Sequence, residues 1–205
     1  SDLELATFLL LDWNPSVIDI REQFPLPLQA TTQIAEQAQI THPRVRNALQ
    51  IMSSDFYIDH KDSKQPNFVL QTKYVADLED IRTIEKLELE RRYWESTKIP
   101  WYILTEKDIP ATVLHNIKWL YPAMREFTIP VYERLNDYIQ KFTQYPHLTL
   151  IELSKKVDQA YDLELGSSLL EIRELLAQRY FIFDITKDYK KLKLSEITLG
   201  DIEVW

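Results

Sequence analysis

Two short stretches of this 205-residue chain carry residue types that suit metal and phosphate chemistry. Asp55 stands at the start of an apolar run, where a carboxylate is disfavoured unless it caps a turn or coordinates something. Sixteen residues later, Gln71 and Lys73 are two apart in a second run, so in a pleated strand both point to one face, about 6.6 Å apart. An Asp on one strand and Q-x-K on its neighbour is the layout of a metal-dependent nuclease core. This spacing is weak by itself, because a turn cap and an exposed polar face explain the same residues.

Two glutamates are further candidates, and each has a structural explanation. Glu4 lies three residues after Ser1, so the Ser-x-x-Glu spacing also fits a capping box at the start of a helix. Glu90 belongs to the charged segment LELERR, where ion pairs with neighbours three and four residues away explain a solvated helix face. Spacing alone leaves both explanations open.

Phosphodiester hydrolysis is the chemistry that this set of residues could perform together. Enzymes lower barriers of this kind by on the order of 8–23 kcal/mol. Divalent metals supply much of that reduction, and two-metal sites hold their ions roughly 3.5–4 Å apart. Only a carboxylate comfortably bridges two such ions, which makes Asp55 the candidate ligand, while Lys73 can orient the attacking water or stabilise charge on the phosphate.

Composition excludes several other classes of function. The 24 basic and 32 acidic side chains give a net charge of −8, which argues against an autonomous nucleic-acid binder. The absence of Cys excludes disulfides, thiolate zinc sites and Cys nucleophiles, and fits a reducing cytosol. Two glycines are too few for a Walker loop or a dinucleotide fingerprint. The four His are scattered, so a metal site must use mainly oxygen ligands, which favours magnesium or manganese.

The elements expected to position these residues make a mixed α/β fold. Apolar periodicity and turn residues predict the following elements: a helix over 1–13, a strand over 17–20, an irregular stretch over 26–50 around a short helix near 34–38, strands over 55–59 and 68–73, a helix over 77–98 and a strand over 101–104. In the long helix we expect one buried face made of Leu78, Ile81, Ile84, Leu87 and Trp94. No apolar run approaches the roughly 18 residues of a membrane span. Because the chain begins with Ser rather than Met, we expect that a segment precedes it.

A second, mainly helical domain is expected from Pro110 onward, which gives domains of 1–109 and 110–205. Helices are predicted over 111–121 and 130–142, and residues 147–205 fit a helix–turn–helix followed by a two-stranded wing in the segment ITKDYKKLKLSEI. Glu171 and Glu174 on the second of these helices suit a major groove poorly. We therefore expect this domain to dock partner proteins, with backbone contact to DNA only through its basic wing.

Long segments of the chain resemble one family of bacterial endonucleases. The segments are SDLELATFLLLDWNPSVIDIREQFPL, HPRVRNALQIMSSDFYIDHKD, LQTK and RTIEKLELERRYWESTKIPWYILTEKDI. Together they resemble the TnsA family, the endonuclease subunits of heteromeric cut-and-paste transposases, and the likeness covers nearly the whole chain. The resemblance implies a restriction-endonuclease-like catalytic domain followed by a winged-helix-like domain.

The same resemblance implies roles for individual residues. The family's catalytic and metal-binding positions fall on Glu4 and Asp55, and the Gln and Lys of its Q-x-K strand fall on Gln71 and Lys73. Glu4, Asp55 and Gln71 would bind Mg²⁺, with Mn²⁺ as a substitute and two ions expected, and Lys73 would assist the water. The family's acidic residue in LELERR falls on Glu90, which would be either a supporting residue of the site or part of a charged surface.

The expected partners follow from the resemblance and from the charge. Transposon-end DNA would be delivered by the recombinase TnsB, which breaks the 3′ strands while this chain cuts near the 5′ ends, and the second domain would engage the ATPase regulator TnsC. Candidate contacts to the DNA backbone are Arg44, Arg46, Arg91 and Arg92. Two alternatives stay open: a non-catalytic, nuclease-like scaffold that assembles the partners, and a stand-alone transcription regulator, which the acidic second helix disfavours.

Overall fold

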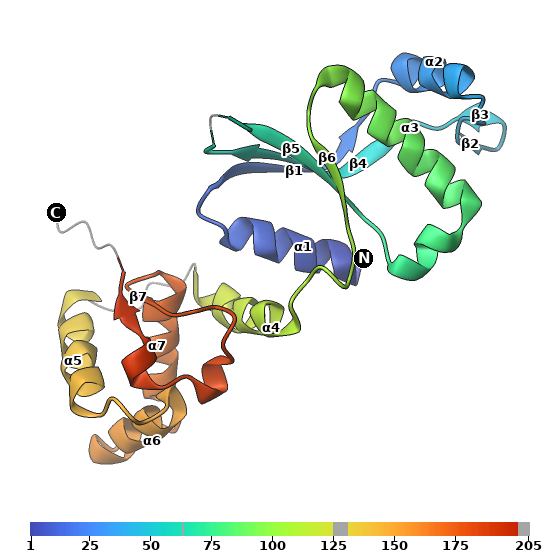
Figure 1. Cartoon of the computed structure of the whole chain (residues 1–205). Helices are drawn as coiled ribbons and strands as arrows, with labels where there is room; N and C mark the ends of the chain where they lie inside the picture. Colours follow the sequence, from blue (N-terminus) through green and yellow to red (C-terminus); the bar gives the residue numbers. More distant parts are fainter. Residues whose placement is uncertain (63, 125–130, 201–205) are drawn as a thin grey trace. The chain divides into compact units, whose positions relative to one another are not determined.

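The structure is a computed structural model, and it describes residues 1–62, 64–124 and 131–200. Contacts within the chain divide it into two compact units, Ser1–Ile109 and Pro110–Trp205 (Figure 1). In the described part of the chain, no helix has both the length and the apolar composition that crossing a membrane requires.

The first unit is a mixed α/β fold, as the sequence predicts. Its elements are α1 (Asp2–Trp13), β1 (Val17–Pro25), α2 (Leu28–Ala38), β2 (Arg44–Val45), β3 (Ala48–Leu49), β4 (Ser53–His60), β5 (Asn67–Thr72), the 3-10 helix η1 (Val75–Glu79), α3 (Ile81–Thr97) and β6 (Trp101–Leu104). The central sheet has the order β1-β4-β5-β6. The first three strands pair antiparallel, whereas β5 and β6 are parallel and are connected through α3.

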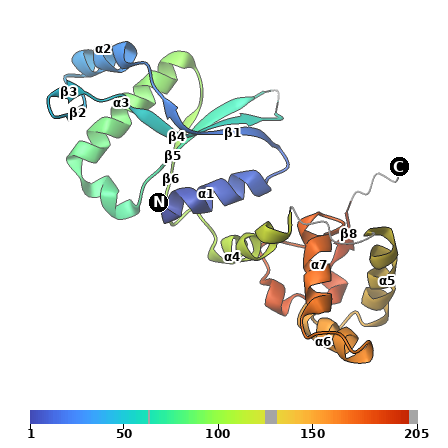
Figure 2. The same ribbon diagram turned by 180° about the vertical axis from the view of Figure 1, so that it is seen from behind.

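Helices cover both faces of this sheet (Figures 1 and 2). On the α1 side the buried cluster consists of Leu11, Phe56, Ile58 and Leu70. On the α3 side it consists of Leu26, Val69 and Trp94. Val69 and Leu70 are neighbours on β5 and point to opposite faces, as successive residues of a strand do. The position of a residue in β5 therefore determines whether its side chain faces α1 or α3.

The segment expected to be irregular contains more regular structure than predicted. The helix α2 begins at Leu28 rather than near Ile34, and β1 continues to Pro25. A two-stranded hairpin, β2–β3, follows α2 and is closed by Arg46 and Asn47, whose φ angles are 47° and 67°. Two positive φ angles are typical of a tight type I′ hairpin turn.

The buried face of α3 also differs from the prediction. Ile81 is 77% exposed and Ile84 is 45% exposed, whereas Leu87, Glu90 and Trp94 are buried. A spacing of three residues falls about 60° short of a full helical turn, so Ile81 lies about 120° around the helix from Leu87. Spacings of three and then four keep Glu90 and Trp94 on one stripe with Leu87, which places a charged residue type in the interior.

The second unit is mainly helical. Its elements are α4 (Ala111–Leu120), the 3-10 helix η2 (Tyr121–Met124), α5 (Val131–Gln144), α6 (Leu150–Ala160), α7 (Ser167–Ala177), β7 (Phe181–Ile182), the 3-10 helices η3 (Tyr189–Lys191) and η4 (Leu194–Glu196), and β8 (Thr198–Leu199). The helix α7 packs against α4, α5 and α6 and is buried at Ile172, Leu175 and Leu176 (Figure 2). The predicted helix start at residue 130 and the last residues, 201–205, lie outside the described residues.

The predicted wing over 185–197 does not form a pair of strands of its own. This stretch contains η3 and η4, and the short strands β7 and β8 pair on either side of it. Asn116 of α4 explains the difference: its Nδ2 donates to Ile185 O at 2.8 Å and Lys187 O at 2.7 Å, and its Oδ1 accepts from Tyr189 N at 3.2 Å. These backbone groups are thereby held by a helix instead of by an opposing strand.

Candidate active site

Asp55 lies where β4 and β5 stop pairing. Regular backbone pairing of the two strands ends at Phe56 and Leu70. Beyond that point, Asp55 Oδ2 accepts hydrogen bonds from Thr72 N at 2.8 Å and from Thr72 Oγ1 at 2.7 Å. The carboxylate thus takes the place of a strand carbonyl and holds the two strands together as they diverge. Asp55 is buried, with 7% of its surface exposed.

Gln71 and Lys73 are fixed around the same point. Gln71 Oε1 accepts a hydrogen bond from Asp55 N at 2.9 Å, and Lys73 Nζ donates to Thr72 O at 2.8 Å. Asp55 Oδ1 receives only a longer hydrogen bond, 3.3 Å, from Gln23 Nε2. This oxygen is therefore the least committed acceptor of the group.

Glu90 is buried beneath these residues at 3% exposure. Its Oε1 accepts hydrogen bonds from Ser54 Oγ at 2.6 Å and Trp101 Nε1 at 2.9 Å, and Ser54 Oγ in turn accepts from Trp94 Nε1 at 2.8 Å. Burial raises the pKa of Glu90 to about 7, because it outweighs the two hydrogen bonds that favour the charged form, and the nearby charge of Asp55 acts in the same direction as burial. Near neutral pH this side chain can therefore hold or release a proton.

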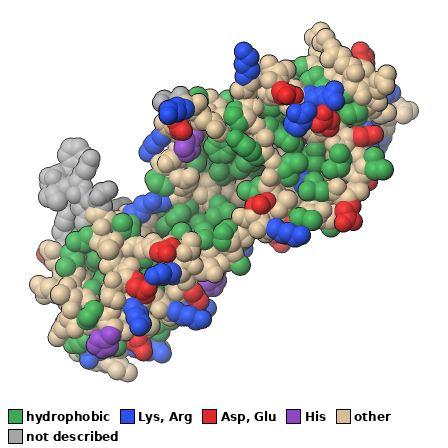
Figure 3. Space-filling model, in the orientation of Figure 1, with side chains coloured by type: hydrophobic (Ala, Val, Ile, Leu, Met, Phe, Trp, Pro, Cys, Tyr) green, Lys and Arg blue, Asp and Glu red, His purple; other side chains and the backbone are tan. Residues whose placement is uncertain are grey.

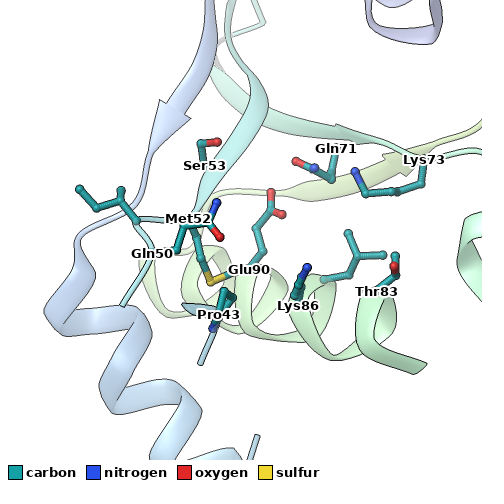
Figure 4. A pocket seen from close by; sticks show the side chains of 11 residues that line it. Pro43, Gln50, Met52, Ser53, Gln71, Lys73, Thr83, Lys86 and Glu90 are labelled. Atoms are coloured by element: carbon teal, nitrogen blue, oxygen red, sulfur yellow. The ribbon is translucent and has the colours of Figure 1, made fainter. Parts of the chain in front are cut away.

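Three of the predicted site residues, Gln71, Lys73 and Glu90, line a pocket of about 260 Å³. Its walls come from the base of the β2–β3 hairpin, the start of β4, the end of β5 and the helix α3. Gln71, Lys73 and Glu90 point toward one another across it (Figure 4). Asp55 is joined to this group by its hydrogen bond to Gln71. Four of the five predicted site residues thus form one connected cluster.

Glu4 is the exception among the five. It does not line the pocket, and among the described residues no hydrogen bond or ion pair links it to Asp55. Instead, Glu4 N donates to Ser1 Oγ at 3.2 Å, and Glu4 Oε1 lies 3.3 Å from Ser1 N. These are the capping contacts that the Ser-x-x-Glu spacing predicts.

The oxygen atoms of the cluster determine what it can bind. In the described part of the chain, no three His, Asp or Glu side chains are grouped closely enough to hold a metal ion. The amide of Gln71 nevertheless accepts from the main-chain N–H of Asp55, and the Asp55 carboxylate is close enough to Glu90 for its charge to add to burial in raising the pKa of that group. Hard oxygen donors in this small number suit Mg²⁺, which usually binds one or two carboxylates and keeps several waters.

The four arginines proposed to contact DNA are in different situations. Arg91 and Arg92 each make a 2.7 Å ion pair with Glu88. Arg44 and Arg46 are exposed on the β2–β3 hairpin, and neither side chain makes a hydrogen bond or ion pair to another described residue. On the face of the molecule seen in Figure 3, basic and acidic side chains of the described residues are interspersed, as expected from the net charge of −8.

Several residues of the site are absent from the sequence-based prediction. Thr72 binds Asp55 and lies between Gln71 and Lys73, so its position in the strand was the available signal. Ser54 precedes Asp55 directly, whereas its bond to Glu90 bridges 36 residues and has no local signal. Lys86 lines the pocket four residues before Glu90, which is one turn of the same helix face.

The mixed α/β fold and this polar cluster at a strand divergence indicate a class of protein, the α/β nucleases. Residues 14–106 match the family described as TnsA-like endonuclease N terminal, and residues 108–185 match the family described as TnsA endonuclease C terminal. The chain is also 44% identical over 203 residues, 98% of its length and 74% of the relative's, to the transposon Tn7 transposition protein TnsA of Escherichia coli. The chain belongs to the TnsA family. It is thus a DNA endonuclease that acts as a transposase subunit, and the family resemblance seen in the sequence is confirmed.

Proposed function

We propose that this endonuclease hydrolyses the phosphodiester at the 5′ ends of the transposon with Mg²⁺ as its cofactor, while TnsB breaks the 3′ ends. The observation that carries the proposal is the position of Asp55. Its carboxylate is buried and fixed at the split between β4 and β5, and its main-chain N–H donates to Gln71, which lines the pocket together with Lys73 and Glu90. A rigid carboxylate beside a polar pocket is what a hydrolytic metal site needs.

Asp55 and Gln71 would hold the magnesium ion, and Mn²⁺ would substitute. When bound, the ion neutralises charge on the phosphate and lowers the pKa of the attacking water. Asp55 Oδ1 is the natural ligand atom, since Oδ2 is committed to Thr72. The second ion that the family resemblance implies requires a further carboxylate, which we assign to Glu4.

The register of the sheet supports this role for Glu4. Its helix, α1, packs against β5. Thr72 pairs with Leu104, which packs against the cluster on the α1 side, so the side chain of Thr72 points to that face of the sheet. Because Thr72 Oγ1 donates to Asp55 Oδ2, this oxygen lies on the face of the sheet that carries α1, whereas Gln71 and Lys73, which alternate with Thr72 along the strand, point to the α3 face.

Lys73 and Glu90 would control charge and protons in the pocket. Lys73 Nζ is anchored by one hydrogen bond to Thr72 O, which leaves two of its three donors for the attacking water or the phosphate. Glu90 binds Ser54 and Trp101 through Oε1, and its Oε2 accepts no hydrogen bond from the described residues. We assign Glu90 to holding the base of the pocket and setting the charge next to Lys73.

Delivery of the DNA would depend on partners. A net charge of −8 opposes independent DNA binding, so we propose that TnsB presents the transposon end and that Arg44 and Arg46 contact its backbone. We do not propose DNA contacts for Arg91 and Arg92, because both already form ion pairs with Glu88. The second unit, with its winged-helix-like order of helices and a short strand pair, would dock TnsC. The burial of α7 supports docking over base reading, because a recognition helix must be open to the groove.

The test is the substitution Asp55→Asn in a reconstituted mixture with TnsB and transposon DNA. Asn keeps an oxygen for Thr72, so the strands should stay together, but it removes the charge. We expect cutting at the 5′ ends to fall at least about a hundredfold, as is usual for loss of a principal catalytic group, while 3′ cutting by TnsB continues. Unchanged 5′ cutting would show that Asp55 is not part of the active site.

A second candidate is a subunit whose nuclease fold serves only to assemble the transposase. The observation that favours it is that the described residues bring no three acidic or His side chains together around a metal position. Calorimetry with Mn²⁺ separates the two candidates. The nuclease proposal expects wild type to bind the ion more tightly than Asp55→Asn or Glu4→Gln, and equal affinities favour the scaffold.

A further inference from the structure

The pocket contains a second cation, Lys86, that neither the sequence motifs nor the proposed chemistry uses. Lys86 comes from α3, four residues and about 6 Å along the helix axis before Glu90. Figure 4 shows it on the helix wall of the pocket, on the side of Thr83. Gln50, at the base of the β2–β3 hairpin, also lines this pocket.

The ion pairs of α3 set Lys86 apart from its neighbours. Arg82 pairs with Glu85 at 2.6 Å, and Arg91 and Arg92 pair with Glu88. Lys86 makes no hydrogen bond or ion pair with a described residue, although acidic side chains are abundant on this helix. The positive charge of Lys86, which lines the pocket, is therefore not neutralised by an ion pair with any described residue.

The acidic groups near Lys86 are committed elsewhere. Asp80 caps the start of α3, where its Oδ2 accepts from Thr83 N and Thr83 Oγ1, both at 2.8 Å. Glu90 is the other carboxyl group of the pocket, and its Oε1 accepts hydrogen bonds from Ser54 and Trp101. Lys86 forms no ion pair with either group, although its charge contributes, after the hydrogen bonds from Thr83, to the lowered pKa of Asp80.

A backbone phosphate is the ligand that fits this situation. Lysine binds phosphate as a point charge on a flexible stem and imposes no planar geometry. The substrate of a DNA endonuclease carries one negative charge for each 3.4 Å of rise along a strand, so the phosphates beside the one being cut must be neutralised near the site. The exposed arginines Arg44 and Arg46 belong to the β2–β3 hairpin, whose base lines the pocket through Pro43 and Gln50, joined by Gln50 N donating to Pro43 O at 2.9 Å.

We propose that Lys86 binds a non-scissile phosphate of the DNA strand in this pocket, next to the phosphodiester held at Asp55 and Lys73. The strand would then run from α3 across the pocket toward the β2–β3 hairpin. This inference rests on the proposed function, because it takes the pocket to be the place of cleavage. Lys86 positions the substrate and takes no part in the bond-breaking step.

The experiment compares Lys86→Gln with Lys98→Gln in the full chain. Both remove one exposed lysine charge from α3, but Lys98 caps the far end of the helix, about 18 Å along the axis from Lys86, and does not line the pocket. Binding of the chain to a fluorescein-labelled transposon-end duplex that already carries TnsB is measured by anisotropy without divalent metal, over a series of salt concentrations.

We expect Lys86→Gln to weaken binding to the TnsB-bound duplex several-fold, by a similar factor when the DNA sequence outside the TnsB-bound end is changed, and to lower the slope of log Kd against log salt by about 1. Lys98→Gln should match wild type, and Lys86→Arg should restore binding. Equal losses in the two Gln variants, no loss in Lys86→Gln, or no measurable binding by wild type would each overturn the proposal.

Cleavage separates this inference from the proposed function. In the reconstituted mixture with TnsB, Asp55→Asn should lose 5′ cutting yet bind the duplex as wild type does. If Asp55→Asn loses cutting and Lys86→Gln binds normally, the phosphate site is wrong and the nuclease site stands. If Asp55→Asn cuts normally, the proposed function fails whatever Lys86 binds.

Discussion

Among the described residues, the most deeply buried carboxylate of the first unit and that of the second are held in different ways. Asp158 in the second unit is 2% exposed, and Glu90 in the first is 3% exposed. Both oxygens of Asp158 are occupied: Oδ1 accepts from Ser168 N at 2.9 Å and Oδ2 from Gly166 N at 2.7 Å. Glu90 uses only Oε1 for its hydrogen bonds to Ser54 and Trp101.

Their pKa values move in opposite directions for this reason. Burial acts to raise the pKa of both groups, but for Asp158 the hydrogen bonds from Ser168 and Gly166 outweigh burial and lower the pKa. For Glu90 burial prevails and raises the pKa to about 7. Asp158 therefore stabilises the start of α7 as a charged group, because the N-terminal end of a helix favours negative charge. Glu90, in contrast, has one oxygen without a hydrogen bond from the described residues and can take up or release a proton near neutral pH.

Glu90→Gln should give the largest effect on stability. The unfolded carboxyl group titrates near 4.5 and the folded one near 7, so the folded state holds the extra proton between these pH values. Wild type therefore loses stability as pH rises through that window, on the order of 3 kcal/mol in full. The Gln variant avoids this loss, because its amide stays neutral. Urea unfolding at pH 5 and pH 8, read by hydrogen exchange in β4 and α3, measures the difference.

Glu88→Gln is the matched control for that experiment. Hydrogen bonding to Arg91 above all lowers the pKa of Glu88 to about 2, and burial opposes it only in part. Its variant should not gain stability relative to wild type between pH 5 and pH 8. A stability difference between Glu90→Gln and wild type that stays constant from pH 5 to pH 8 would contradict the raised pKa.

Asp158→Asn should give a smaller effect, confined to the second unit. Asn retains one acceptor but loses the charge and the second acceptor, so one buried N–H of Ser168 or Gly166 loses its partner, at a cost of about 2 kcal/mol. Hydrogen exchange should rise in α6 and α7, and 5′ cutting per folded molecule should stay unchanged. A loss of 5′ cutting per folded molecule would contradict a purely structural role for the Asp158 carboxylate.

Ser54→Ala should have an effect close to that of Asp158→Asn, about 2 kcal/mol, because it removes the acceptor of Trp94 Nε1 and one of two hydrogen bonds to Glu90. The Ser54 hydrogen bond lowers the pKa of Glu90, so its loss should move that pKa further upward. Carboxyl NMR titration of Glu90 reads this shift directly. A downward shift would show that Ser54 does not stabilise the charged form.

The strands of the catalytic unit could be predicted because their signals are local. The runs around Asp55 and from Phe68 to Lys73 alternate or stay apolar over a few residues and end at turn residues, and β4, β5 and β6 lie where these signals place them. Family resemblance then pointed to Asp55, Gln71, Lys73 and Glu90, which the structure joins in one cluster.

What the sequence does not reveal depends on distant partners or on unusual backbone. The β2–β3 hairpin turns at Arg46 and Asn47 without glycine, so its positive φ angles give no clear turn signal. The expected wing is reorganised by Asn116, some 70 residues earlier in the chain. The burial of Glu90 is unexpected because only the sheet, through Ser54 and Trp101, supplies its partners.

The two roles of Asp55, one observed in the sheet and one proposed in cleavage, have a consequence for how relatives of this chain can lose activity. Its carboxylate replaces a main-chain acceptor for Thr72 at the strand split, so mutation to a residue without a side-chain oxygen would damage the sheet as well as the chemistry. A lineage that abandons cutting while preserving its fold should therefore pass through Asn at this position. An inactive descendant would be recognised by an amide there, long before the rest of the sequence drifts.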